Sequence, residues 1–270
     1  MFRKREGDTF LPITQEAMSK RSKPLLSFPG GKAGVGVYQN IINRMPPHDL
    51  YIEAFLGGGA VLLNKRPALN NIGIDLDQKV IAAWSQYQYP DLQIIHGDAL
   101  DFLSSRIWNE AGKTKTLVYC DPPYLRDARR TNTKLYDCDL SDEASHTKLL
   151  CTLKHLPCMV MLSGYASPLY HSLLSDWRQA HFQTRNRAGH PTRETIWMNY
   201  PEPSKLHDYR YLGHGFRERQ RIKRQQNRWR NRLLSMPELE RNSLIDALYD
   251  LFSQDEHAQQ SDVSTSLGSS

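Results

Sequence analysis

The sequence predicts an α/β protein whose mostly parallel sheet is covered by helices on both faces. Short apolar runs alternate along the chain with longer stretches of helical spacing, which is the pattern of such a sheet. The five expected inner strands are residues 50–55, 71–75, 92–96, 116–120 and 158–163. A last strand is expected at residues 194–200, where Pro201 and Pro203 end it.

Helical stretches separate these strands and follow the last one. Those between the strands are residues 35–44, 60–65, 77–89, 142–155 and 168–177. Residues 216–236 predict a further helix with an apolar stripe on one face. Ser235 and Glu238 have the spacing of a capping box, which predicts one more helix after it. The apolar residues of this last helix, expected to pack inward, are Leu239, Leu244, Ile245, Leu248 and Phe252.

The composition is that of a folded protein without a membrane span. Of the 270 residues, 39% are hydrophobic and 10% aromatic, and a mean hydropathy of −0.61 argues against a membrane-spanning helix. The first residues, MFRKREGDTF, lack the apolar stretch of a signal peptide, which predicts a cytoplasmic protein. The four cysteines form no C-x-x-C pair, so neither a metal site nor a disulfide framework is expected.

Positive charge is concentrated toward the C-terminal end of the chain. The formal net charge is +6, whereas residues 205–232 alone hold ten basic and two acidic residues, a net charge of +8. Such a concentrated positive field suits a polyanionic partner. The alternative is the solvated face of a structural helix, which is common among charged helix surfaces.

Four segments follow from this organisation. Residues 1–22 are a basic lead-in, and residues 253–270 are a tail that lacks the apolar residues needed to pack, so both are expected to be flexible. Residues 23–203 hold the α/β domain. Residues 204–252 form a basic helical appendage.

A glycine loop and two acids follow the first three expected strands, at the edge where open α/β sheets bind ligands. Gly57, Gly58 and Gly59 lie between a strand and a helix, where glycines let the backbone approach a ligand. Asp75 has the spacing of an acid that binds ribose hydroxyls, and Asp98 can accept from an adenine amino group. Each acid could instead cap a helix, and the glycines could serve only tight packing.

The spacing of the glycines separates two classes of adenosine-containing cofactor. A pyrophosphate needs the G-x-G-x-x-G spacing, and this chain has GGGAVL, which disfavours NAD. A cofactor with adenine and ribose but no phosphate fits better. S-adenosylmethionine is the common one.

Five motifs in a fixed order resemble those of the Dam-type (D12 class) adenine-specific DNA methyltransferases. They are FPGGK, EAFLGGGAV, IGID, GDAL and DPPY, and the resemblance spans about residues 25–201. It implies a Rossmann-like methyltransferase fold with an antiparallel last strand, S-adenosylmethionine as cofactor and double-stranded DNA as substrate. A phage-type orphan enzyme and a restriction companion are both compatible with it, and a monomer is expected. The cofactor residues that it implies are Phe28, Pro29, Gly30, Gly31, Lys32, Glu53, Phe55, Gly57, Gly58, Gly59, Asp75 and Asp98.

For that family the DPPY motif, here Asp121, Pro122, Pro123 and Tyr124, lines the site of a flipped adenine. The exocyclic nitrogen of adenine is a poor nucleophile because its lone pair is delocalised into the ring. If Asp121 and the carbonyl of Pro122 accept its two hydrogens, the lone pair can face the methyl group. The prolines present that carbonyl without a competing donor, and Tyr124 offers a flat face to an extruded base. The alternative is an Asp-Pro turn with a tyrosine packed nearby.

Four residues beyond the motif are candidates for the other side of the base. Tyr165 ends the fifth strand, and Trp197, Asn199 and Tyr200 lie in the last one. An ordinary role in the core is at least as good an interpretation of these aromatic residues.

Two basic segments are candidates for DNA contact. The loop at residues 125–137 offers Arg126, Arg129, Arg130, Asn132 and Lys134, and the basic helix offers Arg217, Arg221, Arg224 and Arg228. Dam-type enzymes carry a target-recognition domain before DPPY, but little more than one helix and one strand fit between Asp98 and Asp121. A short or relaxed sequence preference is therefore expected, unless the loop folds on DNA and reads a full site.

Three other functions remain open at this point. The enzyme could methylate the amino group of cytosine in DNA, or of adenine in RNA. The chain could also be a nucleic-acid-binding module that keeps the fold without the activity.

Overall fold

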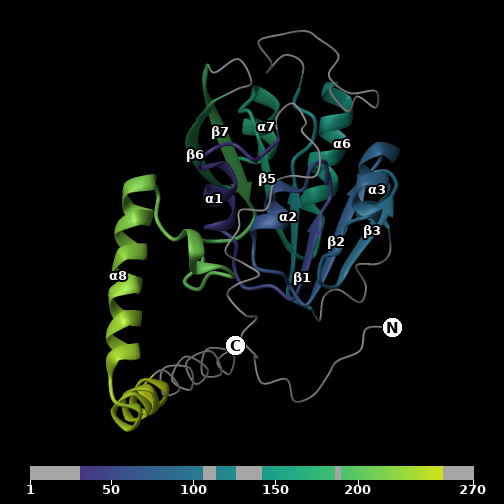
Figure 1. Cartoon of the computed structure of the whole chain (residues 1–270). Coiled ribbons are helices and arrows are strands. Elements are labelled where there is room, and N and C mark those ends of the chain that lie inside the picture. The colour runs from purple at the N-terminus through teal and green to yellow at the C-terminus, as the bar shows by residue number, and fades with distance from the viewer. Residues whose placement is uncertain (1–30, 106–113, 126–141, 186–189, 252–270) are drawn as a thin grey trace, which may run out of the picture. The chain divides into compact units, whose positions relative to one another are not determined.

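The computed structural model describes residues 31–105, 114–125, 142–185 and 190–251. These residues fall into two compact units, one up to Leu212 and one from Gly213 onward. The first unit is built on a seven-stranded sheet in the order β3-β2-β1-β4-β5-β7-β6 (Figure 1). The strands are β1 (Leu50–Glu53), β2 (Asn70–Asp75), β3 (Leu92–His96), β4 (Thr116–Cys120), β5 (Met159–Gly164), β6 (Arg178–Arg185) and β7 (Pro191–Met198).

The sheet is parallel except at β7. β1 pairs in parallel with β2 and β4, β2 with β3, and β4 with β5. β7 runs antiparallel to both of its neighbours, β5 and β6. The predicted fold class, a Rossmann-like α/β fold with a mostly parallel sheet and an antiparallel last strand, is confirmed.

Helices cover both faces of this sheet. Their bounds are α1 (Val37–Ile42), α2 (Ala60–Asn64), α3 (Gln78–Ser85), α4 (Ala99–Ser104), α6 (Glu143–Lys154) and α7 (Pro168–Leu173). α1, α2 and α3 supply one hydrophobic cluster, which contains Tyr51 and Trp84. α4, α6 and α7 supply the other, which contains Val118 and Trp197. Every residue of β4 is buried, because this strand lies at the centre of the sheet between both clusters.

One strand was not predicted from the sequence. β6 has the sequence RQAHFQTR, in which half-buried and exposed residues alternate without a single fully buried one. It lies at the edge of the sheet, where a polar strand can still pair with one neighbour. The neighbouring β7 begins at Pro191 rather than at Glu194, since its first residues pair with β6.

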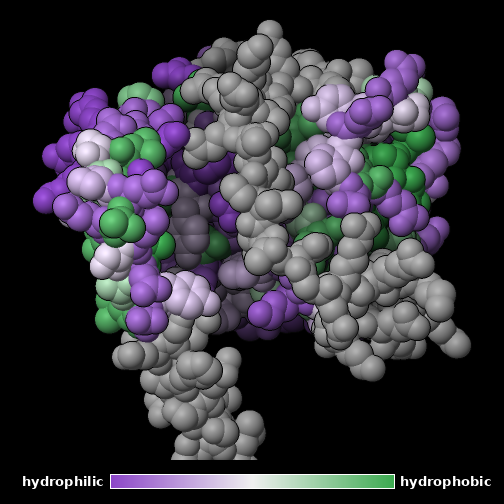
Figure 2. All heavy atoms as spheres, turned by 60° about the horizontal axis from the view of Figure 1, so that its bottom comes forward, coloured by the Kyte–Doolittle hydropathy of each residue, from purple (hydrophilic) through white to green (hydrophobic). Residues whose placement is uncertain are grey.

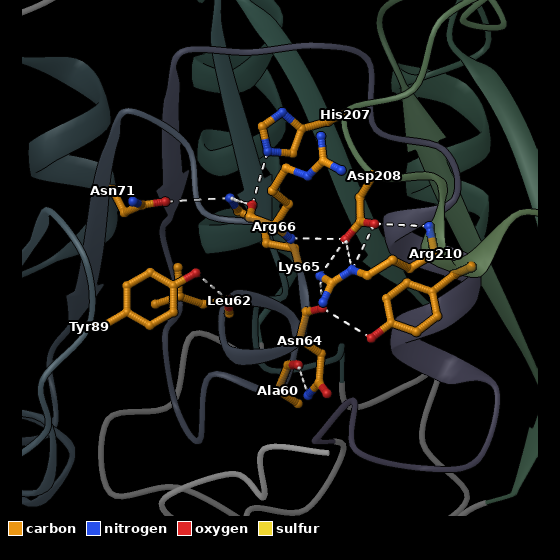
Figure 3. Close-up of polar contacts among 11 residues, drawn as sticks. Ala60, Leu62, Asn64, Lys65, Arg66, Asn71, Tyr89, His207, Asp208 and Arg210 are labelled. Carbon is orange, nitrogen blue, oxygen red and sulfur yellow. Dashed lines mark hydrogen bonds and ion pairs between the residues drawn. The ribbon is translucent and has the colours of Figure 1, made fainter. Parts of the chain in front are cut away.

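A polar network attaches residues 204–212 to the first unit (Figure 3). The carboxylate of Asp208 accepts from the backbone N–H of Arg66 at 2.9 Å and from Nη2 of Arg210 at 2.6 Å. Arg210 Nη2 also donates to the carbonyl of Asn64 at 2.8 Å. These contacts, with the short helix η2 (Tyr209–Tyr211), move the start of the appendage from residue 204 to residue 213.

The second unit contains α8 (Phe216–Ser235) and a helix at residues 238–251. Ser235 is the last residue of α8, and the second helix begins at residue 238, so Ser235 does not occupy the N-cap position of that helix. The apolar side chains that were expected to pack inward are exposed in the described part of this helix. Phe252 lies outside the described residues. The exposed fractions are 84% for Leu239, 37% for Leu244, 51% for Ile245 and 41% for Leu248.

α8 itself buries none of its residues. Hydrophilic side chains surround isolated hydrophobic ones on the left of the view in Figure 2, where α8 lies in Figure 1. Within the described residues, no helix is both long enough and apolar enough to cross a membrane.

Candidate active site

The candidate site lies where β4 and β5 end and β7 approaches them. Asp121 directly follows β4, and Tyr165 directly follows β5. Glu194 of β7 comes to this edge because Thr195 pairs with Gly164, the last residue of β5. The carboxyl ends of the strands are the edge at which open α/β sheets bind their ligands.

Lys32 connects the side chains of Asp121, Tyr124 and Glu194. Its Nζ lies 2.6 Å from Oδ1 of Asp121, 2.5 Å from the hydroxyl of Tyr124 and 3.4 Å from Oε1 of Glu194. Lys32 is only 4% exposed, so the two carboxylates replace the water that its ammonium has lost. FPGGK and DPPY, 89 residues apart, thus meet through this lysine.

One oxygen of Asp121 is fixed and the other remains open. Oδ1 accepts from Lys32 and also from the hydroxyl of Ser163 at 3.0 Å. Ser163 in turn lies 2.9 Å from the hydroxyl of Tyr119, which orients it. Among the described residues no hydrogen bond reaches Oδ2, and the side chain is 18% exposed. The carboxylate is therefore oriented by the protein and still has an oxygen available to a substrate.

The charges of the cluster shift the pKa values of its members. Burial alone would lower the pKa of Lys32, but the carboxylates of Asp121 and Glu194 outweigh burial and raise it. Burial raises the pKa of Glu194, although the ammonium of Lys32 opposes this effect. Burial, followed by the charge of Asp121, raises the pKa of Tyr124 well above its usual value. Lys32 is thus a permanent cation, and Tyr124 remains a neutral phenol.

Two tyrosines place aromatic rings beside Asp121. The rings of Tyr124 and Tyr165 are 4.4 Å apart between centroids and are tilted by 53°. The hydroxyl of Tyr124 donates to Oε1 of Glu194 at 2.6 Å, which fixes the orientation of its ring. Tyr165 thus lies at the end of β5 and next to the DPPY motif, as the sequence predicted.

The glycine loop needs its glycines for backbone reasons. Gly57 and Gly59 have φ values of 47° and 60°, which glycine adopts at least cost. A Cβ on Gly59 would lie 2.1 Å from Cζ2 of Trp84, so only glycine fits there. The indole of Trp84 also donates to the carbonyl of Gly57 at 2.9 Å. The tight-packing role that the sequence left open is therefore realised at Gly59.

Asp75 connects the glycine loop to the end of β2. Its Oδ2 accepts from the backbone N–H of Gly57 at 2.8 Å, and its Oδ1 accepts from that of Asp77 at 2.9 Å. Burial raises the pKa of Asp75. Each oxygen keeps a lone pair for a further donor, so the contacts leave room for a ribose hydroxyl.

The other predicted cofactor residues have contacts of several kinds. Oε2 of Glu53 accepts from the hydroxyl of Tyr51 at 2.9 Å, and burial raises the pKa of Glu53 to about 8. Asp98 caps α4 by accepting from the N–H of Leu100 at 2.6 Å, which is the alternative that the sequence left open. Phe55 packs half-buried on the core. Of the FPGGK motif, Phe28, Pro29 and Gly30 lie outside the described residues, and Gly31 is exposed.

Three of the four additional candidates do not face the site. Trp197 is 1% exposed and packs against the ring of Tyr170, so it is a core residue. Asn199 was predicted wrongly, since its side chain accepts from the N–H of Val160 near the start of β5. Tyr200 donates to the carbonyl of Arg44 and also belongs to the core. Both residues follow the end of β7, which is antiparallel, and therefore lie at the opposite edge of the sheet.

Glu194 and Ser163 were not predicted from the sequence as site residues. The available signal was weak. Glu194 is a single buried acid at the head of an otherwise apolar run, and Ser163 is a hydroxyl within a buried strand. Only the antiparallel pairing of β7 brings Glu194 to Tyr124 and Lys32.

The predicted DNA contacts are only partly described. Arg126, Arg129, Arg130, Asn132 and Lys134 lie outside the described residues. Arg217, Arg221, Arg224 and Arg228 are exposed on α8, and their spacing places them on one face. No group of metal-ligating side chains is found within the described ranges.

No protein-family model matches the chain, and no curated protein sequence matches it either. Solved structures that match include the N-methyltransferase NodS from Bradyrhizobium japonicum WM9 in complex with S-adenosyl-L-homocysteine, at 11% identity and a TM-score of 0.41, covering 57% of this chain and 79% of that one. Another is magnesium protoporphyrin IX methyltransferase from Synechocystis PCC 6803 with bound S-adenosylmethionine, at 13% identity and a TM-score of 0.38, covering 62% and 76%. A third is precorrin 8w decarboxylase from Methanobacterium thermoautotrophicum, at 9% identity and a TM-score of 0.37, covering 58% and 84%. At such values none of these structures determines the function of this chain.

Proposed function

We propose that the chain is an S-adenosylmethionine-dependent methyltransferase that acts on the amino group of adenine in DNA. The observation that carries this proposal is the carboxylate of Asp121, which Lys32 and Ser163 hold by Oδ1 while no described residue forms a hydrogen bond with Oδ2. It stands at the head of the Asp-Pro-Pro-Tyr turn, at the carboxyl end of the central strand. The motif resemblance to the Dam-type enzymes supports adenine in DNA as the substrate.

S-adenosylmethionine is assigned to the edge formed by β1 and β2. The left-handed glycines of the loop after β1 leave backbone exposed there, and Asp75 of β2 orients the first of them. Asp75 would receive the ribose hydroxyls. Glu53 and the glycine loop would hold the methionine part.

The reaction is a direct transfer without a covalent enzyme intermediate. The open Oδ2 of Asp121 and the carbonyl of Pro122 accept the two hydrogens of the adenine amino group, which directs the nitrogen lone pair at the methyl carbon. When bound, S-adenosylmethionine would supply the methyl group, so that an N–C bond would form as the C–S bond breaks and a neutral thioether would leave. The methylated nitrogen then loses one proton toward Asp121. Hydrogen bonds to a charged acceptor contribute about 1.5–3 kcal/mol each.

The charge balance of the site fits this reaction. When both carboxylates are ionised, Asp121 and Glu194 together outweigh the single ammonium of Lys32, so the cluster keeps a net negative charge. Positive charge develops on the amino nitrogen in the transition state, and a preorganised negative site stabilises it. Tyr124 and Tyr165 supply flat faces on which an extruded base can stack.

Asp121→Ala tests the proposal together with Asp75→Ala. Transfer of a labelled methyl group to an adenine-containing duplex should vanish in Asp121→Ala while calorimetry shows unchanged cofactor binding. Asp75→Ala should weaken cofactor binding instead. Near-normal turnover of Asp121→Ala would contradict the mechanism. Transfer to cytosine-only DNA or to RNA, but not to adenine in DNA, would support the alternative amino methyltransferases.

The basic face of α8 is proposed to hold DNA through its phosphates. Arg221, Arg224 and Arg228 are exposed there, and replacing all three by Gln should weaken binding with little sequence bias. Each lost phosphate contact should lower the salt slope by about 0.9. An unchanged salt dependence of DNA binding would contradict this proposal and would favour a structural role for α8.

We also propose a short or relaxed sequence preference. Phosphate contacts position an enzyme but carry no sequence information. Methylated adenines mapped after treatment to saturation should occur in many contexts. Modification confined to one fixed four-base motif would contradict this expectation.

A further inference from the structure

The Asp-Pro-Pro-Tyr turn has few means of holding itself in place. Pro122 and Pro123 have no backbone N–H, so the turn cannot be fastened by their amides. In the parts of the chain that the structure describes, no backbone–backbone hydrogen bond reaches residues 122–125. The carbonyl of Pro122, the proposed acceptor for the substrate, therefore depends on another contact for its orientation.

A buried histidine on α6 supplies such a contact. Nε2 of His146 lies 3.0 Å from the carbonyl oxygen of Pro123, and Nδ1 lies 2.7 Å from the hydroxyl of Tyr170. A carbonyl only accepts, so Nε2 must carry a hydrogen, and in the neutral ring Nδ1 then accepts from Tyr170. His146 is 1% exposed, and Tyr170 is 3% exposed.

The elements around this pair hold it firmly. Asp142 caps α6 by accepting from the N–H of Ser145 at 2.9 Å, and His146 follows in the first turn. The ring of Tyr170 packs on that of Trp197, with centroids 4.9 Å apart. The N-terminal turn of α6 and the ring of Tyr170 thus fix the position of His146 next to the Asp-Pro-Pro-Tyr turn.

We propose that His146 is a positioning residue for the methyl transfer, acting through the carbonyl of Pro123 and held in its tautomer by Tyr170. This role rests on the proposed function and on the geometry of the two adjacent carbonyls. The φ of Pro123 is set by its ring, so only its ψ separates the peptide plane of the Pro122 carbonyl from that of the Pro123 carbonyl. Holding the second carbonyl therefore also orients the first.

Two substitutions of similar size separate positioning from mere packing. In His146→Gln the amide nitrogen can take the place of Nε2 and keep the bond to Pro123. In His146→Asn the shorter side chain reaches only the place of Nδ1, so the bond to Pro123 is lost. A misplacement of about 1 Å can cost about a hundredfold in rate. We expect kcat to fall by about tenfold to a hundredfold in His146→Asn, with little change in cofactor affinity or in KM for DNA, and to recover largely in His146→Gln.

Tyr170→Phe supplies an independent test. It removes the hydroxyl that fixes the tautomer of His146, so kcat should fall by severalfold while the ring packing on Trp197 is kept. Equal kcat values in His146→Asn and His146→Gln, or full activity in His146→Asn, would overturn the proposal.

A spectroscopic measurement makes the result independent of the assigned substrate. Pro123–Tyr124 is the only Pro-Tyr pair in the sequence, so proline labelled at its ¹³C carbonyl and tyrosine labelled with ¹⁵N give one correlated signal. Its carbonyl shift should move in His146→Asn and stay in His146→Gln. If the wild type methylates no adenine, the proposed function fails, while this shift still reports the contact. An unmoved shift in His146→Asn would overturn the positioning role.

Discussion

Two lysines of the first unit are almost equally buried, yet their surroundings are opposite. Lys32 is 4% exposed and touches Asp121 and Glu194. Lys65 is 2% exposed, and its Nζ donates to the carbonyl of Arg66 at 2.9 Å and lies 4.1 Å from the ring centroid of Tyr51. Within the described residues, no carboxylate lies at ion-pair distance from Lys65.

These surroundings shift the pKa values of the two lysines in opposite directions. Burial would lower the pKa of Lys32, but the adjoining carboxylates raise it above the usual value. Burial lowers the pKa of Lys65 to about 7, and the more distant charges of Glu53 and Asp208 only partly oppose it. Burial therefore does not distinguish a functional lysine from a structural one. The carboxylates around it do, because they decide whether its charge is kept at neutral pH.

Lys32→Met should have the largest effect. It leaves the buried carboxylate of Glu194 and the partly buried one of Asp121 without their cation, and removing one partner of a buried pair costs about 3–5 kcal/mol. It also frees the carboxylate of Asp121, so kcat should fall by about a hundredfold. Chemical unfolding measures the loss of stability, and methyl-transfer kinetics measure the fall in kcat. Lys154→Met, at an exposed pair with Asp176, is the control and should leave stability and turnover nearly unchanged, because water screens this pair. Wild-type turnover of Lys32→Met would remove the contrast between the two lysines.

Asp208→Ala should affect stability strongly but not the chemistry. Asp208 is fully buried and accepts from the backbone of Arg66 and from the side chain of Arg210. Its loss leaves a partly buried guanidinium without its counterion and should cost about 3 kcal/mol. The kcat of the folded fraction should stay at the wild-type value, because this network lies away from Asp121. A kcat that falls in proportion to the lost stability would show that the two regions are coupled.

The contrast also shows what the sequence could predict. The DPPY turn and the glycine loop are each formed by consecutive residues. They could therefore be predicted from proline and glycine placed directly after apolar runs. The contact between Asp208 and Arg66 joins positions 142 residues apart, and no local pattern encodes it. Glu194 reaches Lys32 only because β7 reverses direction. β6 was missed because its polar alternation resembles a loop when its partner strand is unknown.

The pH dependence of stability should separate the two lysines. Lys65 has a folded pKa of about 7 against 10.5 unfolded, so its folded state binds fewer protons between these values and stability rises with pH there. The destabilisation that comes from burying the charged lysine is greatest below pH 7. Lys32 has a raised pKa, so its contribution is constant below pH 10.5 and is lost as the pH rises from 10.5 through its folded pKa. The free energy of unfolding of the wild type, measured relative to that of Lys65→Met, should therefore increase between pH 7 and pH 10. A constant difference would show that Lys65 keeps its charge.

Glu53→Gln should have the smallest effect and tests the acid that lies between the two regions. Glu53 has a pKa raised to about 8 from 4.5, chiefly by burial, with the charge of Asp121 adding to the shift and that of Lys65 opposing it. Its folded state binds more protons between these values, so wild-type stability falls as pH rises from 4.5 to 8. Glutamine resembles the protonated acid and can still accept from Tyr51 and from the N–H of Leu62. The variant should match wild type near pH 5 and become the more stable protein by about 1 kcal/mol or more near pH 8. Unfolding curves without cofactor measure this crossover. Equal stabilities at both pH values would mean that Glu53 is ionised in the fold and is paired with Lys65 as an extended ion pair.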